Sequence, residues 1–271
     1  MNRTMLYPAS MIPLVVLLPL LAACSGHDHS SANTRSVGDT IGSARHLVLI
    51  DKSAAPYHVS AVPSPGSLTG TASFTGTPKG DTLIQIARDQ NGCGKPLVIK
   101  RLDRHRGNVT GAVVWLTDVR AGEPLPLARR FELDNDDCAW NPTIQAVFAG
   151  GTLNVTNSDP LAERAFATDI TTGDTVAIAP FTDDGQLIPY DRLLRTPGVY
   201  EFSVESRPMS RAWVAVFDHP YFAVTNAAGA FTIDGIPPGT HHIRAWHPML
   251  GITDGTVTIL PNKPTTVTLR W

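Results

Sequence analysis

Short apolar runs separated by Gly, Pro and Asn follow one another from residue 66 to the end of the chain. The runs at residues 199–204 and 212–217 lie close together and are rich in β-branched and aromatic side chains. Such runs, with turn residues between them, indicate the strands of a β-sandwich or barrel. No segment shows a long apolar repeat of 3.6 residues, so we expect few helices. The sequence therefore predicts an all-β body.

The length of 271 residues, 42% of them hydrophobic, suffices for one large or two small domains with a proper core. The 22 Gly and 22 Pro suit a chain with many tight turns. The net charge of −2 gives no sign of the basic face that nucleic-acid binders carry, so we expect no nucleic-acid partner.

The N-terminus has the features of a targeting segment. Arg3 precedes an apolar stretch at residues 11–20, which two prolines interrupt and which is too short for a comfortable membrane span. Small residues, Ala22 and Ala23, then stand before Cys24. This resembles a bacterial lipobox and implies a signal peptide over residues 1–23 and a lipid on Cys24. The alternative is an ordinary secretory signal with a coincidental cysteine.

Residues 24–65 are rich in Ser, Ala, Pro, Gly and His and lack periodicity, so we expect a flexible tether there. The protein would then be lipid-anchored in the cell envelope, facing the periplasm. Ser25 after the cysteine favours, by resemblance, the outer membrane.

Two further cysteines, Cys93 and Cys138, remain after Cys24. Export places them in an oxidising compartment, where a disulfide is the default. The alternative is a pair of separate buried thiols.

The chain lacks the sequence signatures of catalysis. Residues 92–96 faintly resemble a phosphate-binding loop, but Pro96 stands where a Ser or Thr must reach the magnesium ion. Neither a nucleophile elbow, a zinc-protease helix nor a dinucleotide fingerprint occurs. We therefore expect neither an enzyme nor a bound cofactor.

The C-terminal segment, residues 219–271, resembles a carboxypeptidase regulatory-like domain, which is a small transthyretin-like sandwich. The resemblance rests on residues 226–233 and on the Pro-Pro-Gly turn that begins at Pro237. In this pattern Gly229 takes a positive φ and Gly239 completes the corner.

The middle segment, residues 66–218, resembles a cupredoxin-like domain. Residues 66–271 together are similar to a bacterial family that joins these two domains, some members of which are labelled methylamine-utilisation proteins. The matching stretches are residues 91–94, 111–116, 157–160, 211–216, 218–225 and 245–251. The resemblance implies two β-sandwiches with a boundary near residue 219.

The family binds copper through the patterns NSDPxxH and CxxHPxM, and this chain departs from both. Glu163 stands in place of the first His, and Val204, Arg207 and Ser210 stand where Cys, His and Met belong. A soft copper site needs the thiolate and both imidazoles. We therefore expect a degenerate site without metal.

A carboxylate and a guanidinium now occupy two of these positions. Glu163 and Arg207 could form an ion pair that joins two loops in place of the metal, because a guanidinium can bind a carboxylate through two hydrogen bonds. The alternative is two independent surface charges on separate loops.

These features predict a non-catalytic envelope lipoprotein, a binding or structural module whose partner is an envelope protein or a glycan. One alternative is a copper-handling or electron-transfer protein with a relocated site among its scattered histidines, although His219, His241, His242 and His247 suit structural roles better. Another is a carbohydrate- or peptidoglycan-binding module. That module would need exposed aromatic side chains, whereas Trp115 and Trp246 have the apolar neighbours of buried residues.

Overall fold

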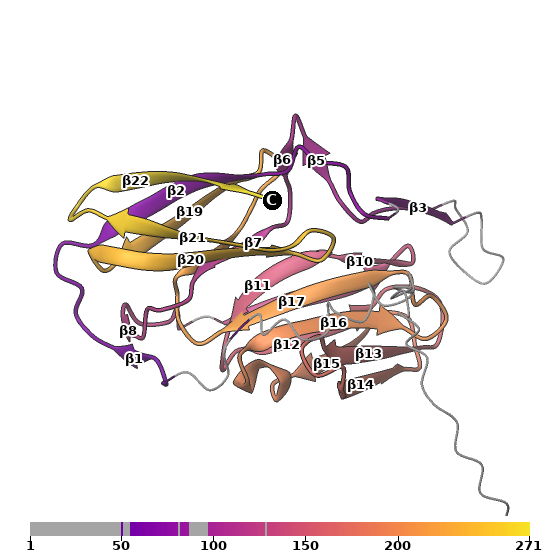
Figure 1. Ribbon diagram of the computed structural model, residues 1–271. Coiled ribbons are helices and arrows are strands. Elements are labelled where there is room, and N and C mark those ends of the chain that lie inside the picture. Colours follow the sequence, from indigo (N-terminus) through magenta and orange to yellow (C-terminus); the bar gives the residue numbers. More distant parts are fainter. Residues whose placement is uncertain (1–49, 51–54, 81, 87–96, 128) are drawn as a thin grey trace, which may run out of the picture. The chain divides into compact units, whose positions relative to one another are not determined.

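The computed structural model describes residues 50, 55–80, 82–86, 97–127 and 129–271, and the all-β prediction is confirmed for them (Figure 1). Their only helical element is a single 3-10 turn, η2 (Leu193–Arg195). No helix among these residues has the length and apolarity needed to span a bilayer. They belong to one compact unit that runs from Asp39 to Trp271.

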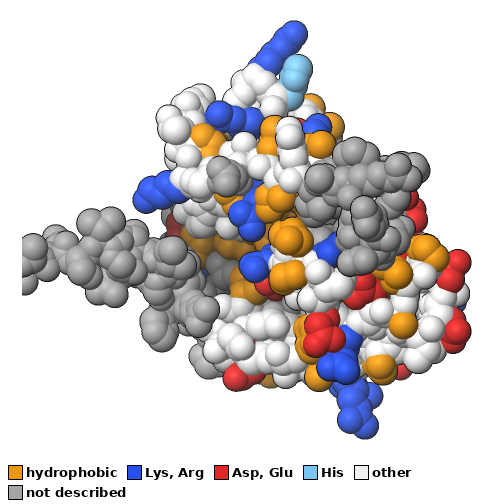
Figure 2. Space-filling model, turned by 90° about the vertical axis from the view of Figure 1, so that its right-hand side faces the viewer, with side chains coloured by type: hydrophobic (Ala, Val, Ile, Leu, Met, Phe, Trp, Pro, Cys, Tyr) orange, Lys and Arg blue, Asp and Glu red, His pale blue; other side chains and the backbone are white. Residues whose placement is uncertain are grey.

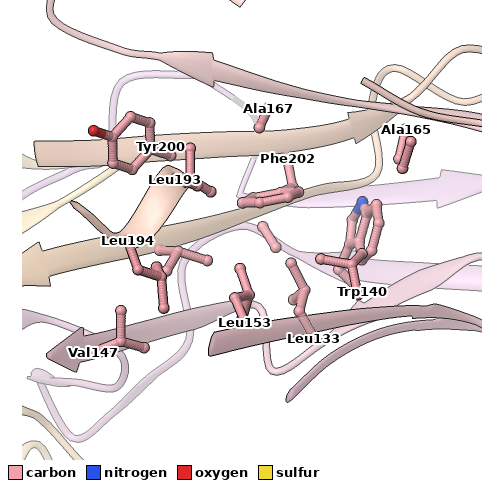
Figure 3. Close-up of a cluster of buried hydrophobic side chains, with 14 of the residues drawn as sticks. Leu133, Trp140, Val147, Leu153, Ala165, Ala167, Leu193, Leu194, Tyr200 and Phe202 are labelled. Atoms are coloured by element: carbon pink, nitrogen blue, oxygen red, sulfur yellow. The ribbon is translucent and has the colours of Figure 1, made fainter. Parts of the chain in front are cut away.

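One sandwich is built entirely from the middle of the chain. Its four-stranded sheet has the order β10 (Ala139–Asn141), β9 (Arg130–Asp136), β12 (Thr152–Asn157), β15 (Gln186–Tyr190). Its five-stranded sheet has the order β11 (Ile144–Phe148), β17 (Arg211–Phe217), β16 (Gly198–Val204), β13 (Glu163–Asp169), β14 (Thr175–Phe181). Between the sheets lies a hydrophobic core, in which Leu133 and Leu153 point toward Phe202 (Figure 3). We call this unit the first sandwich.

The second sandwich combines both ends of the body. One sheet has the order β18 (Phe222–Val224), β7 (Val113–Leu116), β20 (Gly239–His247), β21 (Gly251–Ile259). The other has the order β19 (Ala230–Ile236), β2 (Gly66–Ser73), β6 (Asn108–Val109), β5 (Arg104–His105), with β22 (Pro264–Arg270) also paired to β2. A separate hairpin joins β3 (Leu83–Ile86) to β4 (Leu97–Lys100).

The pairing of strands differs from the division into residues 66–218 and 219–271 that the sequence suggested. β2 pairs with β19 and β22, and β7 pairs with β18 and β20, so both lie in the second sandwich. The reason is that the C-terminal strands alone leave the centre of each sheet empty, and two strands from the start of the body fill it. Local sequence patterns identify a strand but carry little information about a partner more than a hundred residues away.

The two sandwiches share a core. Val113 and Trp115 on β7 lie with Ala215 and Phe217 on β17 in one cluster of buried side chains, joined by Trp246 on β20. The alternate residues of the same strands, such as Val114 and Val216, enter the cores within each sandwich. Because β7 and β17 are buried on both faces, they read as unbroken apolar runs instead of alternating ones. All four clusters of buried hydrophobic residues come from residues 50–271.

The end of the predicted tether belongs to the folded body. β1 (His58–Val59) pairs in parallel with β8 (Ala121–Gly122), and the Tyr57 hydroxyl donates to the Glu123 carbonyl at 2.6 Å. Tyr57 also packs against the core of the second sandwich. The tether assigned to residues 24–65 is therefore too long at its C-terminal end.

The predicted glycine turn of the C-terminal segment is present. Gly229 has a φ of +70°, and a Cβ there would lie 2.6 Å from the Cβ of Asn108. The conformation and the close approach both require glycine. This turn therefore positions β19 against β2.

Candidate functional site

The four positions aligned with copper ligands lie together at one end of the first sandwich. Glu163 is the first residue of β13, Val204 is the last of β16, and Arg207 and Ser210 lie in the turn that leads to β17. Two backbone hydrogen bonds shape this turn, from Arg207 N to the Val204 carbonyl at 3.3 Å and from Ser210 N to the Arg207 carbonyl at 3.0 Å. All four residues are buried.

The ion pair between Glu163 and Arg207 is present. The Nη2 atom of Arg207 donates to Oε1 of Glu163 at 2.8 Å, and the two side chains are 4% and 3% exposed. The Ser206 hydroxyl donates to the same carboxylate oxygen at 2.6 Å. The alternative of two independent surface charges on separate loops is therefore wrong. Arg164, the neighbouring cation, lies 3.7 Å from Glu205 and both of those side chains are largely exposed.

A second carboxylate, which the sequence analysis did not single out, joins the pair. Asp159 Oδ2 lies 3.4 Å from Arg207 Nη2, and the Asp159 side chain is 3% exposed. The same carboxylate accepts hydrogen bonds from the backbone N–H of Cys138 at 3.0 and 3.1 Å. Burial raises the pKa of Asp159 above its ordinary value of 3.8, whereas the Cys138 N–H and the charge of Arg207 lower it. The sequence feature that could have identified Asp159 as a site residue is its position in the Asn-Ser-Asp-Pro stretch at residues 157–160.

Two buried asparagines tie this carboxylate to the sheet. Asn135 on β9 and Asn157 on β12 are paired in the parallel register, and Asn135 Nδ2 donates to Asn157 Oδ1 at 3.0 Å. Asn135 Nδ2 also donates to Asp159 Oδ2 at 2.9 Å. Asn157 Nδ2 in turn donates to the carbonyls of Asp159 and Leu161 at 3.2 and 2.8 Å. These bonds fix the loop that carries Asp159.

We call Asn135, Asn157, Asp159, Glu163, Ser206 and Arg207 the polar network. Its charged groups are two carboxylates and one guanidinium, which lies between them. Among the residues that the structure describes, no group of three or more His, Cys, Asp or Glu side chains could hold a metal ion. With a guanidinium at its centre and neither thiolate nor imidazole, the network does not fit a copper ion.

Two histidines of the described chain are buried and neutral. Burial lowers the pKa of His219 to about 3 and that of His247 to about 4. His219 Nδ1 accepts from the backbone N–H of Tyr221 at 3.2 Å, and His247 Nδ1 accepts from that of Met249 at 3.1 Å. In both residues the imidazole thus fixes a nearby backbone N–H, which suits a structural role.

A cavity of about 260 Å³ opens beside the network. Its lining residues are Val98, Ile99, Lys100, Ala139, Trp140, Thr143, Ser210 and Arg211. The lining contains neither a carboxylate nor an imidazole, so the cavity does not offer the ligands of a metal site.

None of the five tryptophan side chains is exposed: three are buried, and Trp213 and Trp271 are half-buried. Trp115, Trp140 and Trp246 are 3%, 4% and 5% exposed, which agrees with the burial expected for Trp115 and Trp246. The described strands therefore give little support to a carbohydrate-binding module.

Two of the three cysteines, Cys24 and Cys93, lie outside the described residues. Cys138 is fully buried in the turn between β9 and β10. Lipidation of Cys24 and the disulfide between Cys93 and Cys138 stay predictions.

Comparisons with known proteins identify no family. No family model matches the chain, and no curated protein matches it. Among solved structures, a purple cupredoxin from Nitrosopumilus maritimus is 17% identical, with a TM-score of 0.29 over 32% of this chain and 99% of its own. An auracyanin from Roseiflexus castenholzii is 15% identical, with a TM-score of 0.26 over 34% of this chain and 99% of its own. An amicyanin variant with Cu(I) is 17% identical, with a TM-score of 0.29 over 35% of this chain and 87% of its own. The similarity to cupredoxins is thus distant and covers about a third of the chain.

Proposed function

We propose that this protein is a non-catalytic, lipid-anchored module of the bacterial cell envelope, a structural or binding protein whose first sandwich has exchanged a copper site for the polar network. One observation carries the proposal: Arg207 Nη2 contacts both Glu163 and Asp159 at the place where the aligned copper ligands would converge. A metal ion joins loops because side chains from each loop coordinate it. The guanidinium joins the same loops by donating hydrogen bonds to carboxylates.

The burial of the polar network supports a structural role for it. Its central side chains are almost fully buried, so little of the guanidinium or of either carboxylate is available to a substrate. Buried polar groups that hydrogen-bond to one another rigidify the segments that carry them. Among the described residues, Arg207 Nε and Asn135 Oδ1 are the atoms of the network that have no hydrogen-bond partner. The proposal therefore assigns the network to holding the loops, and leaves partner binding to the outer surface.

Restoring the family's ligands tests this proposal. The substitutions Glu163→His, Val204→Cys, Arg207→His and Ser210→Met in one chain should create a copper site with an intense visible thiolate-to-copper absorption. The unchanged protein should bind no stoichiometric copper in elemental analysis. A matched control with Val204 retained should bind copper more weakly and lack the thiolate absorption.

Two results would contradict the proposal. Stoichiometric copper in the unchanged protein would favour the copper-handling alternative. A folded variant with all four substitutions that gives no thiolate absorption would show that these positions are not a former metal site.

The proposed lipid anchor on Cys24 is tested by a separate experiment. Cys24→Ser should abolish labelling of the protein by a radioactive fatty acid in bacteria, because no other side chain in the lipobox can form the thioether. Ala23→Gly keeps a small residue before the cysteine and is the matched control. Labelling that persists in Cys24→Ser would show that the lipobox interpretation is wrong.

A further inference from the structure

A local basic segment lies within this chain despite its overall net charge of −2. Between residues 100 and 106 the chain has Lys100, Arg101, Arg104, His105 and Arg106, with Asp103 as the only acidic residue. With the histidine neutral, these seven residues carry a net charge of +3. The net charge of the whole chain conceals this segment, because acidic residues elsewhere balance it.

The fold projects this segment outward as a hairpin. β5 and β6 pair through Arg104 with Val109 and His105 with Asn108, and Arg106 at the tip has a φ of +54°. Figure 2 shows Lys, Arg and His side chains at the top of the view, where Figure 1 places the β5–β6 hairpin. Arg104, His105 and Arg106 are all exposed. We call residues 100–109 the basic hairpin.

The base of the basic hairpin is fixed to the second sandwich. Leu102 is 6% exposed and lies in a small hydrophobic cluster with Ala72 and Val109. Arg104 Nη1 donates to the carbonyls of Phe74 and Gly76 at 3.2 and 3.1 Å, and its guanidinium lies 5.5 Å from the centre of the Phe74 ring. The cationic side chains are therefore held on a supported protrusion and not on a free loop.

Few negative charges compensate for the basic hairpin. Asp103 lies 3.8 Å from Lys100, and these side chains are 50% and 63% exposed, so water screens their attraction. Exposed Arg270 adds a further positive charge nearby, because Ser73 on β2 pairs with both Asn108 and Arg270. A compact cationic protrusion of this kind fits a surface of densely spaced anions.

We propose that the basic hairpin docks on the anionic phospholipid headgroups of the membrane that holds the lipid anchor. This step rests on the proposed anchoring at Cys24. Ile50 packs against the core that the two sandwiches share, and the 25 residues from 25 to 49 have a maximal extended length of about 80 Å. This length lets the hairpin reach the bilayer that holds the anchor. A lipid chain and a basic patch together hold a protein on a membrane more firmly than one chain does. A bilayer is favoured over a dissolved anionic polymer because the anchor keeps the bilayer within constant reach.

Sedimentation with vesicles tests the proposal without the lipid anchor. A chain of residues 25–271 keeps the whole compact unit and all four hydrophobic clusters. It should bind vesicles that contain phosphatidylglycerol, bind phosphatidylcholine vesicles far less, and lose binding as salt is added. Each cation near an anionic surface contributes about 1 kcal/mol, which is about fivefold in the partition coefficient.

Three variants make the test specific. Lys100→Gln with Arg106→Asn should weaken binding about 30-fold, and asparagine tolerates the positive φ at the tip. Asp103→Asn should strengthen binding about fivefold, a gain that misfolding cannot produce. Arg192→Gln with Arg195→Gln, two exposed cations of the first sandwich, removes the same charge and should change binding little.

Equal binding to both kinds of vesicle, or equal losses in the two double variants, would overturn the proposal. So would binding to a soluble anionic polysaccharide without binding to phosphatidylglycerol vesicles, which would identify a glycan partner instead. Because the chain used here has no lipid, these outcomes are independent of whether Cys24 is lipidated.

Discussion

Replacing Arg207 by methionine is expected to lower the free energy of unfolding by about 3–5 kcal/mol. Methionine fills much of the same space, but Asp159 and Glu163 then stay buried without a compensating positive charge. Urea denaturation at neutral pH, followed by circular dichroism, measures the change. A loss below about 1 kcal/mol would show that the ion pair behaves as an exposed one.

The pH dependence of this loss has a definite sign. The charge of Arg207 is one of the causes that lower the pKa of Asp159, so its removal leaves burial to raise that pKa further in the folded state. A raised folded-state pKa lowers stability as the pH rises from the unfolded value toward the folded one. The deficit of Arg207→Met should therefore be largest at neutral pH and should shrink in mildly acidic solution, where the carboxyl group of Asp159 takes up a proton.

Two comparisons show whether the loss of stability in Arg207→Met comes from the ion pair with Glu163. Arg164→Gln removes a neighbouring cation whose partner Glu205 is exposed, and should cost about 0–1 kcal/mol. A double-mutant cycle with Glu163→Gln and Arg207→Gln should give a coupling energy of about 0.5–3 kcal/mol. Strict additivity of the two single changes would contradict the structural role of the pair.

Replacing Phe217 by alanine is expected to cost about 3–5 kcal/mol, because it opens a cavity in the core that the two sandwiches share. The Phe217 ring stacks on Phe222 with centroids 4.6 Å apart and lies 5.6 Å from Trp115. Since the shared core links both sandwiches, the unchanged protein should unfold in a single transition. Tryptophan fluorescence and circular dichroism should then report the same midpoint.

The matched control for Phe217→Ala is Val176→Ala on the edge strand β14. Val176 is 47% exposed, and its truncation should change stability by less than about 0.5 kcal/mol. Two separate unfolding transitions in the unchanged protein would show that each sandwich is stable alone, and that the shared core contributes little.

The sequence determined the class of the fold and one pair of its site. Runs of β-branched and aromatic residues with glycine and proline between them have the period of strands, whatever those strands pair with. Residues 113–116 are apolar at every position, as expected of a strand buried on both faces, and β7 lies between β18 and β20. Glu163 and Arg207 could be brought together because a resemblance supplied the positions at which two distant loops converge.

Only the tertiary structure decided which strands share a sheet and which charges share a site. β2 and β7 join the C-terminal strands because those sheets need central partners, and strand pairing depends on the fit of whole surfaces and not on local pattern. Asp159 became part of the polar network because Asn135, Cys138 and Arg207 all donate to it from other elements. Such convergence has no signature along the chain, because each donor is set by a separate turn or strand and the three meet only when the sandwich closes.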